Sequence, residues 1–219
     1  MLAKTLISKT IVPLKTSDTG EFALGCMSDY NVNHFPIVNN QQLLGLISDQ
    51  DIMDSDIAEA IGSYSLALTQ AHVQGDEHLY EVMRLLSEHQ LTVIPVVDED
   101  NNYVGVITQS DLIKFFADTG SFSEPGSIVV LEIVKSDYSM AEISQIVESE
   151  GGVILSSFIT TNLDESVMDV TLKINKNQIQ SIIANFERYS YKIKFSYQEA
   201  EEFDTVRERY DSLMSYLNV

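Results

Sequence analysis

Two stretches of the sequence place a glycine, a hydroxyl residue and a carboxylate at the same spacing, GLISDQD at residues 45–51 and GVITQSD at residues 105–111. The polar residues that they share are Ser48, Asp51, Thr108 and Asp111. A hydroxyl residue at a helix start with a carboxylate three residues later is typical of a capping box, which satisfies free backbone N–H groups. The same atoms suit a sugar phosphate, because a helix start favours an anion and a carboxylate can accept from both hydroxyls of a ribose. For a single stretch, both interpretations remain open.

The two stretches belong to a longer internal repeat. Residues 34–53 (HFPIVNNQQLLGLISDQDIM) align with residues 93–113 (VIPVVDEDNNYVGVITQSDLI) when one residue is inserted, and the spacing of about 60 residues fits a duplicated small subdomain. Each copy has the pattern of a strand, a polar turn, a second strand and a helix start. An amphipathic helix precedes each copy, at residues 21–30 and 79–86. We therefore predict two β-α-β-β-α units.

The repeat favours nucleotide binding over a purely structural cap. A cap needs only the hydroxyl and the carboxylate, whereas both copies also keep a glycine (Gly45, Gly105) and a proline (Pro36, Pro95). We expect each glycine to leave room beside its strand, and the apolar residues around each proline to provide walls for a flat base.

The composition excludes several classes of partner. The chain has 219 residues, enough for one or two domains, with 44% hydrophobic residues and a mean hydropathy near zero. Its net charge of -20, from 33 acidic and 13 basic residues, argues against nucleic acid and anionic membranes as partners. The single cysteine, Cys26, excludes an internal disulfide, and no apolar run reaches the roughly 18 residues of a membrane span. Because the N-terminus lacks the apolar core of a signal peptide, we expect a cytoplasmic protein.

We expect no enzyme activity, no metal site and no required cofactor. None of the four histidines (His34, His72, His78, His89) stands at metal-ligand spacing from another histidine or from the cysteine. The sequence has no nucleophile elbow, no phosphate-binding loop and no dinucleotide fingerprint. His34 and His72 lie near the starts of the two repeats, where they can either contact a ligand or pack at the surface.

The second half of the chain has a different pattern. Residues 123–127 (SEPGS) form a turn that we take as a domain boundary. Strands are predicted at residues 128–134, 153–160, 167–174 and 191–197, and helices at residues 140–150 and 178–186. This is the β-α-β-β-α-β order of a ferredoxin-like domain, and Ser139 with Glu142 predicts a capping box at its first helix.

The tail is predicted to be a helix with one apolar stripe. The stripe has steps of three and four residues and consists of Phe203, Val206, Tyr210, Leu213 and Leu217. It can pack on its own domain or form a dimer contact, and it is too short to hold a coiled coil alone. In all, we predict an α/β chain with repeats at residues 1–62 and 63–122, a ferredoxin-like domain at residues 127–197 and a helix at residues 198–219.

The first half resembles a known family. The match rests on Phe-Pro-Ile-Val and Ile-Pro-Val-Val, each followed by Gly-x-Ile-[Ser/Thr]-x-x-Asp, and it makes residues 1 to about 120 similar to a tandem pair of CBS domains, the Bateman module. The resemblance implies a non-catalytic regulatory protein that binds an adenosine-containing ligand, such as AMP, ADP, ATP or S-adenosylmethionine, in the cleft between the repeats. It also implies pairing into a homodimer.

The same resemblance assigns roles to individual residues. It implies that Asp51 and Asp111 hold the ribose, and that Ser48 and Thr108 contact phosphate or ribose. The base pocket would be lined by Phe35, Ile37, Ile94 and Val96. The strands that lead into the repeats, at residues 11–14 and 71–73, would add contacts, with Val12 and His72 among them.

The negative charge of this half restricts which adenosine ligands we expect. Only five basic side chains lie between residues 1 and 125, against 18 acidic ones. Because a free triphosphate would meet a negative field there, we expect a monophosphate, a nucleoside-like ligand or a triphosphate paired with Mg²⁺.

Residues 128–197 resemble an ACT domain, a family that often binds amino acids at a glycine before the first helix. This chain has Asp-Tyr-Ser-Met at residues 137–140 and no glycine there, so a pairing or packing role is favoured. Two CBS repeats followed by an ACT-like domain are similar to the acetoin-utilisation family of bacterial proteins. Three hypotheses follow: an adenosine-ligand sensor that signals to the ACT-like half or to an unidentified partner protein, an oligomerising scaffold with empty clefts, and an amino-acid sensor acting through the ACT-like half.

Overall fold

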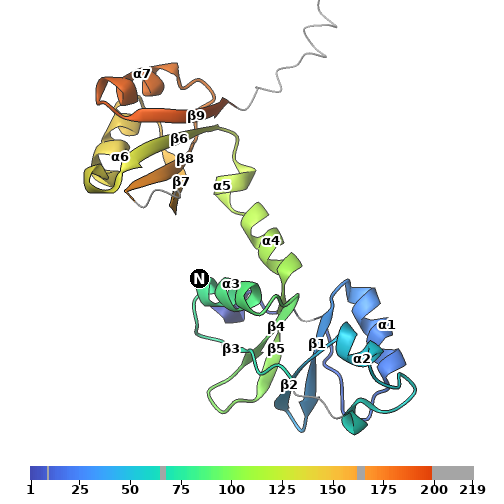
Figure 1. Cartoon of the computed structure of the whole chain (residues 1–219). Coiled ribbons are helices and arrows are strands. Elements are labelled where there is room, and N and C mark those ends of the chain that lie inside the picture. Colours follow the sequence, from blue (N-terminus) through green and yellow to red (C-terminus); the bar gives the residue numbers. More distant parts are fainter. Residues whose placement is uncertain (9, 65–67, 162–165, 199–219) are drawn as a thin grey trace, which may run out of the picture. The chain divides into compact units, whose positions relative to one another are not determined.

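The computed structural model describes residues 1–8, 10–64, 68–161 and 166–198, and it divides into two compact units, Met1–Phe116 and Ala117–Val219 (Figure 1). Both units contain helices and strands, which confirms the predicted α/β class. The first unit holds the two repeats, and the second holds the ferredoxin-like domain.

The first unit contains nearly the same elements twice. The first copy comprises α1 (Gly20–Tyr30), β1 (His34–Asn39), β2 (Gln42–Ser48) and α2 (Asp49–Met53). The second comprises β3 (Val73–Gln74), α3 (Leu79–Glu88), β4 (Val93–Val97), β5 (Tyr103–Thr108) and α4 (Gln109–Ala117). In each copy the two longer strands form an antiparallel hairpin, and positive φ angles at Asn40, Gln41 and Asn101 shape the polar turns.

A strand that leads into the repeat forms in the second copy only. β3 pairs in parallel with β4, although it begins at Val73 rather than at residue 71. The strand expected at residues 11–14 is absent, and Leu14 makes a single parallel bridge to Ile37. The next bond of this ladder would be donated by residue 36 to Val12 O, and Pro36 has no N–H to donate, which is one reason why the ladder does not extend there.

The two copies exchange the segments that lead into them. The segment before the first copy bonds to the second copy, with the Ser8 N–H donating to Val106 O at 2.8 Å. The segment before the second copy bonds to the first in the equivalent place, where the Leu46 N–H donates to Thr69 O at 2.9 Å. We call these the leading segments; they comprise residues 1–8 and residues 59–64 with 68–70. Because each copy completes the other, the two fold as one unit.

One continuous hydrophobic core runs through both copies. Phe35 and Ile37 of β1 and Ile94 and Val96 of β4 belong to it, and each is at most 2% exposed. The amphipathic helices bury one face each: α3 buries Leu79, Val82 and Leu86 and leaves Tyr80 exposed.

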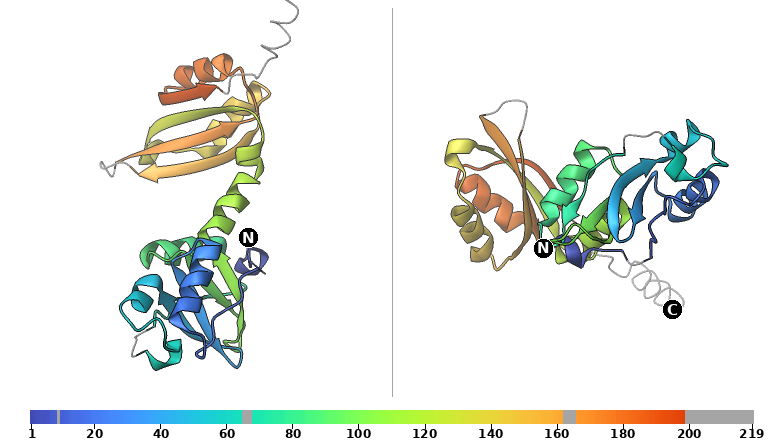
Figure 2. Two further views of the ribbon diagram at one scale, coloured as in Figure 1. Left: turned by 90° about the vertical axis from the view of Figure 1, so that its right-hand side faces the viewer. Right: turned by 90° about the horizontal axis from the view of Figure 1, so that it is seen from below.

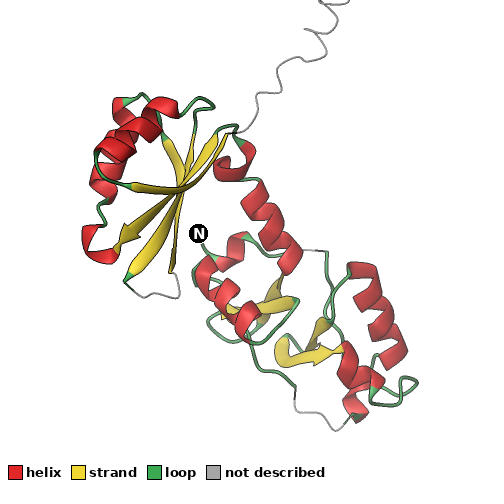
Figure 3. Ribbon diagram, turned by 45° about the horizontal axis from the view of Figure 1, so that its top comes forward, coloured by secondary structure: helices red, strands yellow, loops and turns green. Residues whose placement is uncertain are grey.

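The second unit has the β-α-β-β-α-β order that the sequence predicts. A short helix, α5 (Gly120–Ser123), is followed by β6 (Ser127–Val134), α6 (Met140–Ser149), β7 (Ile154–Thr161), β8 (Val167–Ile174), α7 (Gln180–Arg188) and β9 (Lys192–Gln198). The four strands form one antiparallel sheet in the order β7-β8-β6-β9, which confirms the ferredoxin-like plan. Helices α6 and α7 lie on the same face of this sheet, as Figure 2 and Figure 3 show from different directions.

Alternation along the strands decides which residues lie under these helices. Val129, Leu131 and Ile133 of β6 are buried in a second core cluster with residues of α6 and α7. The residues between them, such as Val130 and Glu132, point to the other face of the sheet.

The capping box predicted at α6 is half formed. Ser139 Oγ accepts from the Glu142 N–H at 3.3 Å, as expected. The Glu142 carboxylate accepts instead from the Tyr191 hydroxyl at 2.7 Å. Burial raises the pKa of Tyr191, and the hydrogen bond to Glu142 raises it further. The helix predicted for residues 198–219 lies outside the described residues, apart from Gln198, which ends β9.

Candidate functional site

The first polar stretch lies where β2 ends and α2 begins. Ser48 is the N-cap of α2, and its Oγ accepts from the Asp51 N–H at 3.1 Å. Asp51 Oδ2 in turn accepts from the Ser48 N–H at 3.0 Å and from the Ser48 hydroxyl at 2.6 Å. The capping box that one interpretation predicts is therefore complete.

The second stretch repeats this geometry at the junction of β5 and α4. Thr108 Oγ1 accepts from the Asp111 N–H at 3.0 Å. Asp111 Oδ2 accepts from the Thr108 N–H at 2.9 Å and from the Thr108 hydroxyl at 2.8 Å. The structure thus joins the four polar residues into two equivalent pairs within one compact unit.

In the caps, each carboxylate can still accept further hydrogen bonds, whereas each hydroxyl has already donated its only proton. A carboxylate can accept about four hydrogen bonds, and each cap uses two, both at Oδ2. Within the described part of the chain, Oδ1 of Asp51 and Oδ1 of Asp111 accept no hydrogen bond from another residue. Each hydroxyl has a single proton, which its aspartate accepts. Ser48 or Thr108 can therefore donate to a phosphate only by releasing its aspartate.

The room beside each glycine is taken by a leading segment. A Cβ on Gly45 would lie 2.7 Å from Leu68 Cβ and 3.1 Å from Thr69 O. A Cβ on Gly105 would overlap Ile7 Cγ2. The space that we expected these glycines to leave for a ligand therefore holds the protein's own chain.

The residues predicted to line a base pocket lie in the core. The side chains of Phe35, Ile37, Ile94 and Val96 are at most 2% exposed, so in this structure they offer no surface to a ligand. Contact with a base would have to come from their backbone or from a rearranged cleft, and their role stays a prediction.

Val12 and His72, the other predicted contacts, are both exposed. The side chain of Val12 is 71% exposed. His72 Nδ1 lies 3.1 Å from the backbone oxygen of Gln70, which belongs to the second leading segment. Both side chains are accessible to a ligand, and neither is tied to Asp51 or Asp111 by a described contact.

A cavity of about 280 Å³ in the first unit lies between α1 and the start of α2. Its lining includes Asn33, Asp49 and Met53, but not Ser48 or Asp51. The Asn33 amide donates to Asp49 Oδ2 at 3.0 Å across this region. This cavity therefore does not coincide with the predicted ligand contacts.

A polar contact joins the two copies through residues that the sequence analysis did not pair. Thr92 Oγ1 accepts from the N–H groups of Asn33 at 2.9 Å and His34 at 3.1 Å. With these bonds made, the Thr92 hydroxyl is left to donate to His34 Nδ1, 3.2 Å away, which assigns the neutral ring proton to Nε2. Burial lowers the pKa of His34, against the opposing charges of Asp49 and Asp51.

The repeat alignment contains the signal for this contact. Asn33 and Thr92 occupy equivalent positions, each directly before the first aligned residue of its copy. Equivalent positions meet where two similar copies pack about an approximate twofold axis, so a pairing of these residues could have been predicted.

Positive charge is scarce around the candidate site. Arg84 already forms ion pairs with Glu81, at 2.5 Å, and with Glu88. Lys114 lies on α4, one turn after Asp111, and so brings a positive charge close to the second polar pair. The helix dipole also differs between the copies, because α4 has nine residues and α2 has five. The start of α4 is thus the more favourable place for a phosphate.

Neither a candidate metal cluster nor a candidate membrane span occurs in the described part of the chain. Across residues 1–8, 10–64, 68–161 and 166–198, no group of three or more His, Cys, Asp or Glu side chains could hold a metal ion. None of the helices in these ranges is both long and apolar enough to cross a membrane.

Comparison with known proteins assigns the first unit to a family. The CBS domain family matches residues 3–58 and 69–118. An uncharacterized protein of Methanocaldococcus jannaschii is 28% identical over 109 residues, which cover 49% of this chain and 41% of that protein. The inosine-5'-monophosphate dehydrogenase of the same organism is 25% identical over 115 residues, 51% of this chain and 23% of the enzyme. The chain therefore spans less than half the length of these curated relatives.

Solved structures include similar chains. A CBS domain pair/ACT domain protein of Thermotoga maritima is 21% identical, with a TM-score of 0.48 over 54% of this chain and 98% of that chain. CBSX2 in complex with AMP is 20% identical, with a TM-score of 0.46 over 52% of this chain and 95% of that one. Because both copies of its repeat match the family, this chain belongs to the proteins that carry a tandem pair of CBS domains.

Proposed function

We propose that the chain is a non-catalytic regulatory protein whose CBS pair binds an adenosine-containing ligand. Tandem CBS domains commonly bind adenosine nucleotides as regulatory modules. The observation that carries the proposal is the unused Oδ1 of Asp51 and of Asp111, presented at two equivalent strand-to-helix junctions. Each Oδ1 can accept from the hydroxyls of a ribose while Oδ2 stays in the cap.

The ligand that fits the charge of the unit is AMP or another adenosine compound of low charge. The excess of acidic residues in the first 125 positions opposes a free triphosphate, and ATP would bind with Mg²⁺. Because α4 is longer than α2, we place the tighter site at Thr108 and Asp111. No cofactor is required.

Regulation follows if the ligand binds one packing of the two copies more tightly than another. Contacts from α2 and α4 would then bias that packing, and the ACT-like domain or a partner protein would respond to it. The proposal includes a homodimer and a cytoplasmic location, where adenosine ligands are plentiful.

Isothermal titration calorimetry of the full chain with AMP, ADP, ATP with and without Mg²⁺, and S-adenosylmethionine tests the proposal. A compound that binds, present at one hundred times its Kd, should also raise the unfolding free energy of the chain by about 2.7 kcal/mol. We expect AMP to bind, and free ATP to bind more weakly than ATP with Mg²⁺.

The variant Asp111→Asn distinguishes the role of the carboxylate in ligand binding from its role in capping the helix. The asparagine oxygen still accepts from the Thr108 N–H, but the negative charge that receives the ribose is lost. A hydrogen bond to a charged group contributes about 1.5–3 kcal/mol, so we expect affinity to fall about 10- to 100-fold. Asp51→Asn should have a smaller effect. Glu142→Gln is the matched control, because it changes an acidic residue at the same helix position in the second unit.

Three results would count against the proposal. If both asparagine variants lose stability and keep full affinity, the carboxylates are caps only. If no adenosine compound binds, the oligomerising scaffold is the better description. A response to amino acids alone would favour a sensor that acts through the ACT-like domain.

A further inference from the structure

The sheet of the second unit has one face that neither α6 nor α7 covers. The cross-strand register fixes which side chains share it: Val130 on β6 stands opposite Thr171 on β8 and Phe195 on β9, and Thr171 stands opposite Phe158 on β7. In the next row Ile128 stands between Tyr197 on β9 and Lys173 on β8. We call the surface formed by Ile128, Val130, Phe158, Thr171, Phe195 and Tyr197 the open face.

The open face is rich in apolar side chains that remain accessible. Phe158 is 49% exposed, Phe195 56% and Tyr197 52%, although α5 lies against β7 nearby. Ile128 and Val130 are half-buried and do not belong to the core cluster under the helices. A sheet with two apolar faces normally packs a layer on each, so this face lacks a cover within the described part of the chain.

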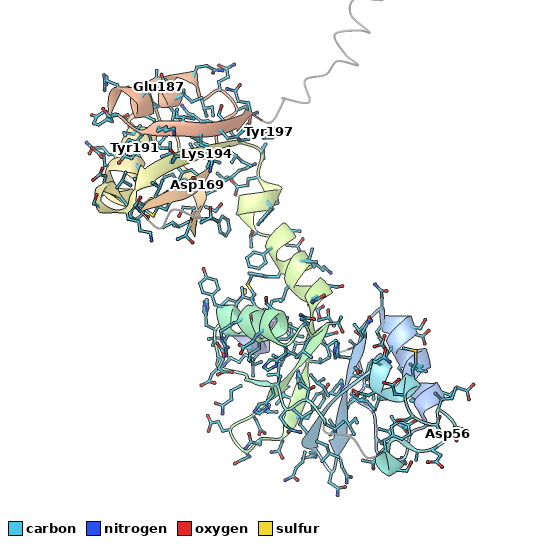
Figure 4. The ribbon with its side chains drawn as sticks, in the orientation of Figure 1. Asp56, Asp169, Glu187, Tyr191, Lys194 and Tyr197 are labelled. Carbon is cyan, nitrogen blue, oxygen red and sulfur yellow. The ribbon has the colours of Figure 1, made fainter. Side chains whose placement is uncertain are left out.

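Charged side chains border the open face on one side. Glu132 of β6 and Asp169 of β8 stand opposite each other in the register. Lys192 Nζ lies 2.5 Å from Glu132 Oε1, and Lys194 Nζ lies 2.6 Å from Asp169 Oδ2 (Figure 4). These pairs keep the border polar, whereas Phe195 and Tyr197 extend the apolar surface toward the end of β9.

We propose that residues 199–219 of the same chain cover the open face. The chain leaves β9 at Gln198, directly after Tyr197 and opposite Ser127, the first residue of β6. Four residues, 199–202, separate this point from the first apolar residue of the stripe, Phe203. Four extended residues reach about 13 Å, which exceeds the roughly 10 Å between packed layers.

The length and pattern of this segment suit the surface. Residues 203–217 as a helix would measure about 22 Å, and a strand of eight residues measures about 26 Å. The stripe of Phe203, Val206, Tyr210, Leu213 and Leu217 would face the apolar rows. Attachment to β9 also gives this segment a local concentration in the millimolar range, which a second copy does not have.

Single tryptophans in the full chain test this proposal, because the natural sequence contains no tryptophan. Tyr210→Trp places the probe on the apolar stripe, and the matched control Ser212→Trp places it on the opposite side of the same helix. We expect a blue-shifted emission and protection from acrylamide quenching for Tyr210→Trp only. The signal should not depend on protein concentration or on added nucleotide.

A second substitution identifies the surface. Phe195→Ser in the Tyr210→Trp background should return the emission to that of an exposed tryptophan. Tyr189→Ser, which changes another half-exposed aromatic residue away from the open face, should leave it blue-shifted. Circular dichroism verifies that each variant is folded. Where Phe195→Ser unfolds the unit, a chain that ends at Gln198 should bind the dye ANS more strongly and lose about 5 °C or more in Tm.

The proposal is wrong if Tyr210→Trp and Ser212→Trp emit alike. It is also wrong if the blue shift survives Phe195→Ser in a folded variant, or if it disappears on dilution together with a fall in mass, because a second copy would then cover the stripe.

Discussion

Two glycine-to-alanine substitutions in the first unit make the same chemical change and should have opposite effects. Gly45 has a φ of +142°, a conformation that is nearly restricted to glycine and costs other residues about 1–3 kcal/mol. Its new Cβ would lie 2.7 Å from Leu68 Cβ and 2.9 Å from Gln70 Nε2, and such overpacking costs a further 1–3 kcal/mol or so. We expect Gly45→Ala to lower the unfolding free energy by roughly 2–6 kcal/mol.

Gly25→Ala is the matched control. Gly25 lies within α1, and an added Cβ would meet no atom within 4 Å. Alanine restricts the unfolded chain more than glycine does, so this variant should gain about 0.5–1 kcal/mol.

Urea unfolding followed by circular dichroism measures both changes by linear extrapolation. Hydrogen exchange then locates the damage, because the Leu46 N–H, which donates to Thr69 O, should exchange faster in Gly45→Ala. The reasoning fails if Gly45→Ala is as stable as the parent chain, since the leading segment would then not pack against β2 as described.

Two further predictions concern a titrating side chain and a buried tyrosine. The pKa of folded His34 lies below its ordinary 6.5, so its contribution to stability is complete above that pH and is lost as the pH falls beneath it. His34→Gln should flatten the dependence of the unfolding free energy on pH as the pH falls below 6.5. Tyr191→Phe should cost the second unit about 1–2 kcal/mol in thermal unfolding, because Glu142 loses its 2.7 Å hydrogen bond, and an unchanged Tm would show that this bond contributes nothing.

The sequence predicts the order of the elements well because each depends on local pattern. Alternation along residues 128–134 and 167–174 gives β6 and β8, which begin within one residue of their predicted positions. The duplicated glycines and aspartates likewise predict two equivalent strand-to-helix junctions, and both are present.

Contacts between distant segments could not be predicted in the same way. Phe35 and Ile37 are apolar and two residues apart, a pattern that suits a core strand and the wall of a ligand pocket equally. Their burial depends on tertiary packing that the spacing of one strand does not encode. Glu142 is a similar case, because a hydroxyl 49 residues away competes with the local cap for its carboxylate.

The complete capping boxes do not argue against a ligand site, because the two roles use different atoms. Two donors hold Oδ2 of each aspartate, so the carboxylate is fixed before any ligand arrives, and binding need not restrict a mobile side chain. The proton of each hydroxyl stays in the cap, which makes the charge at Oδ1 the main recognition element. A site of this kind recognises the diol of a sugar better than it recognises a chain of phosphates. This preference agrees with the charge of residues 1–125, which carry 18 acidic and five basic side chains.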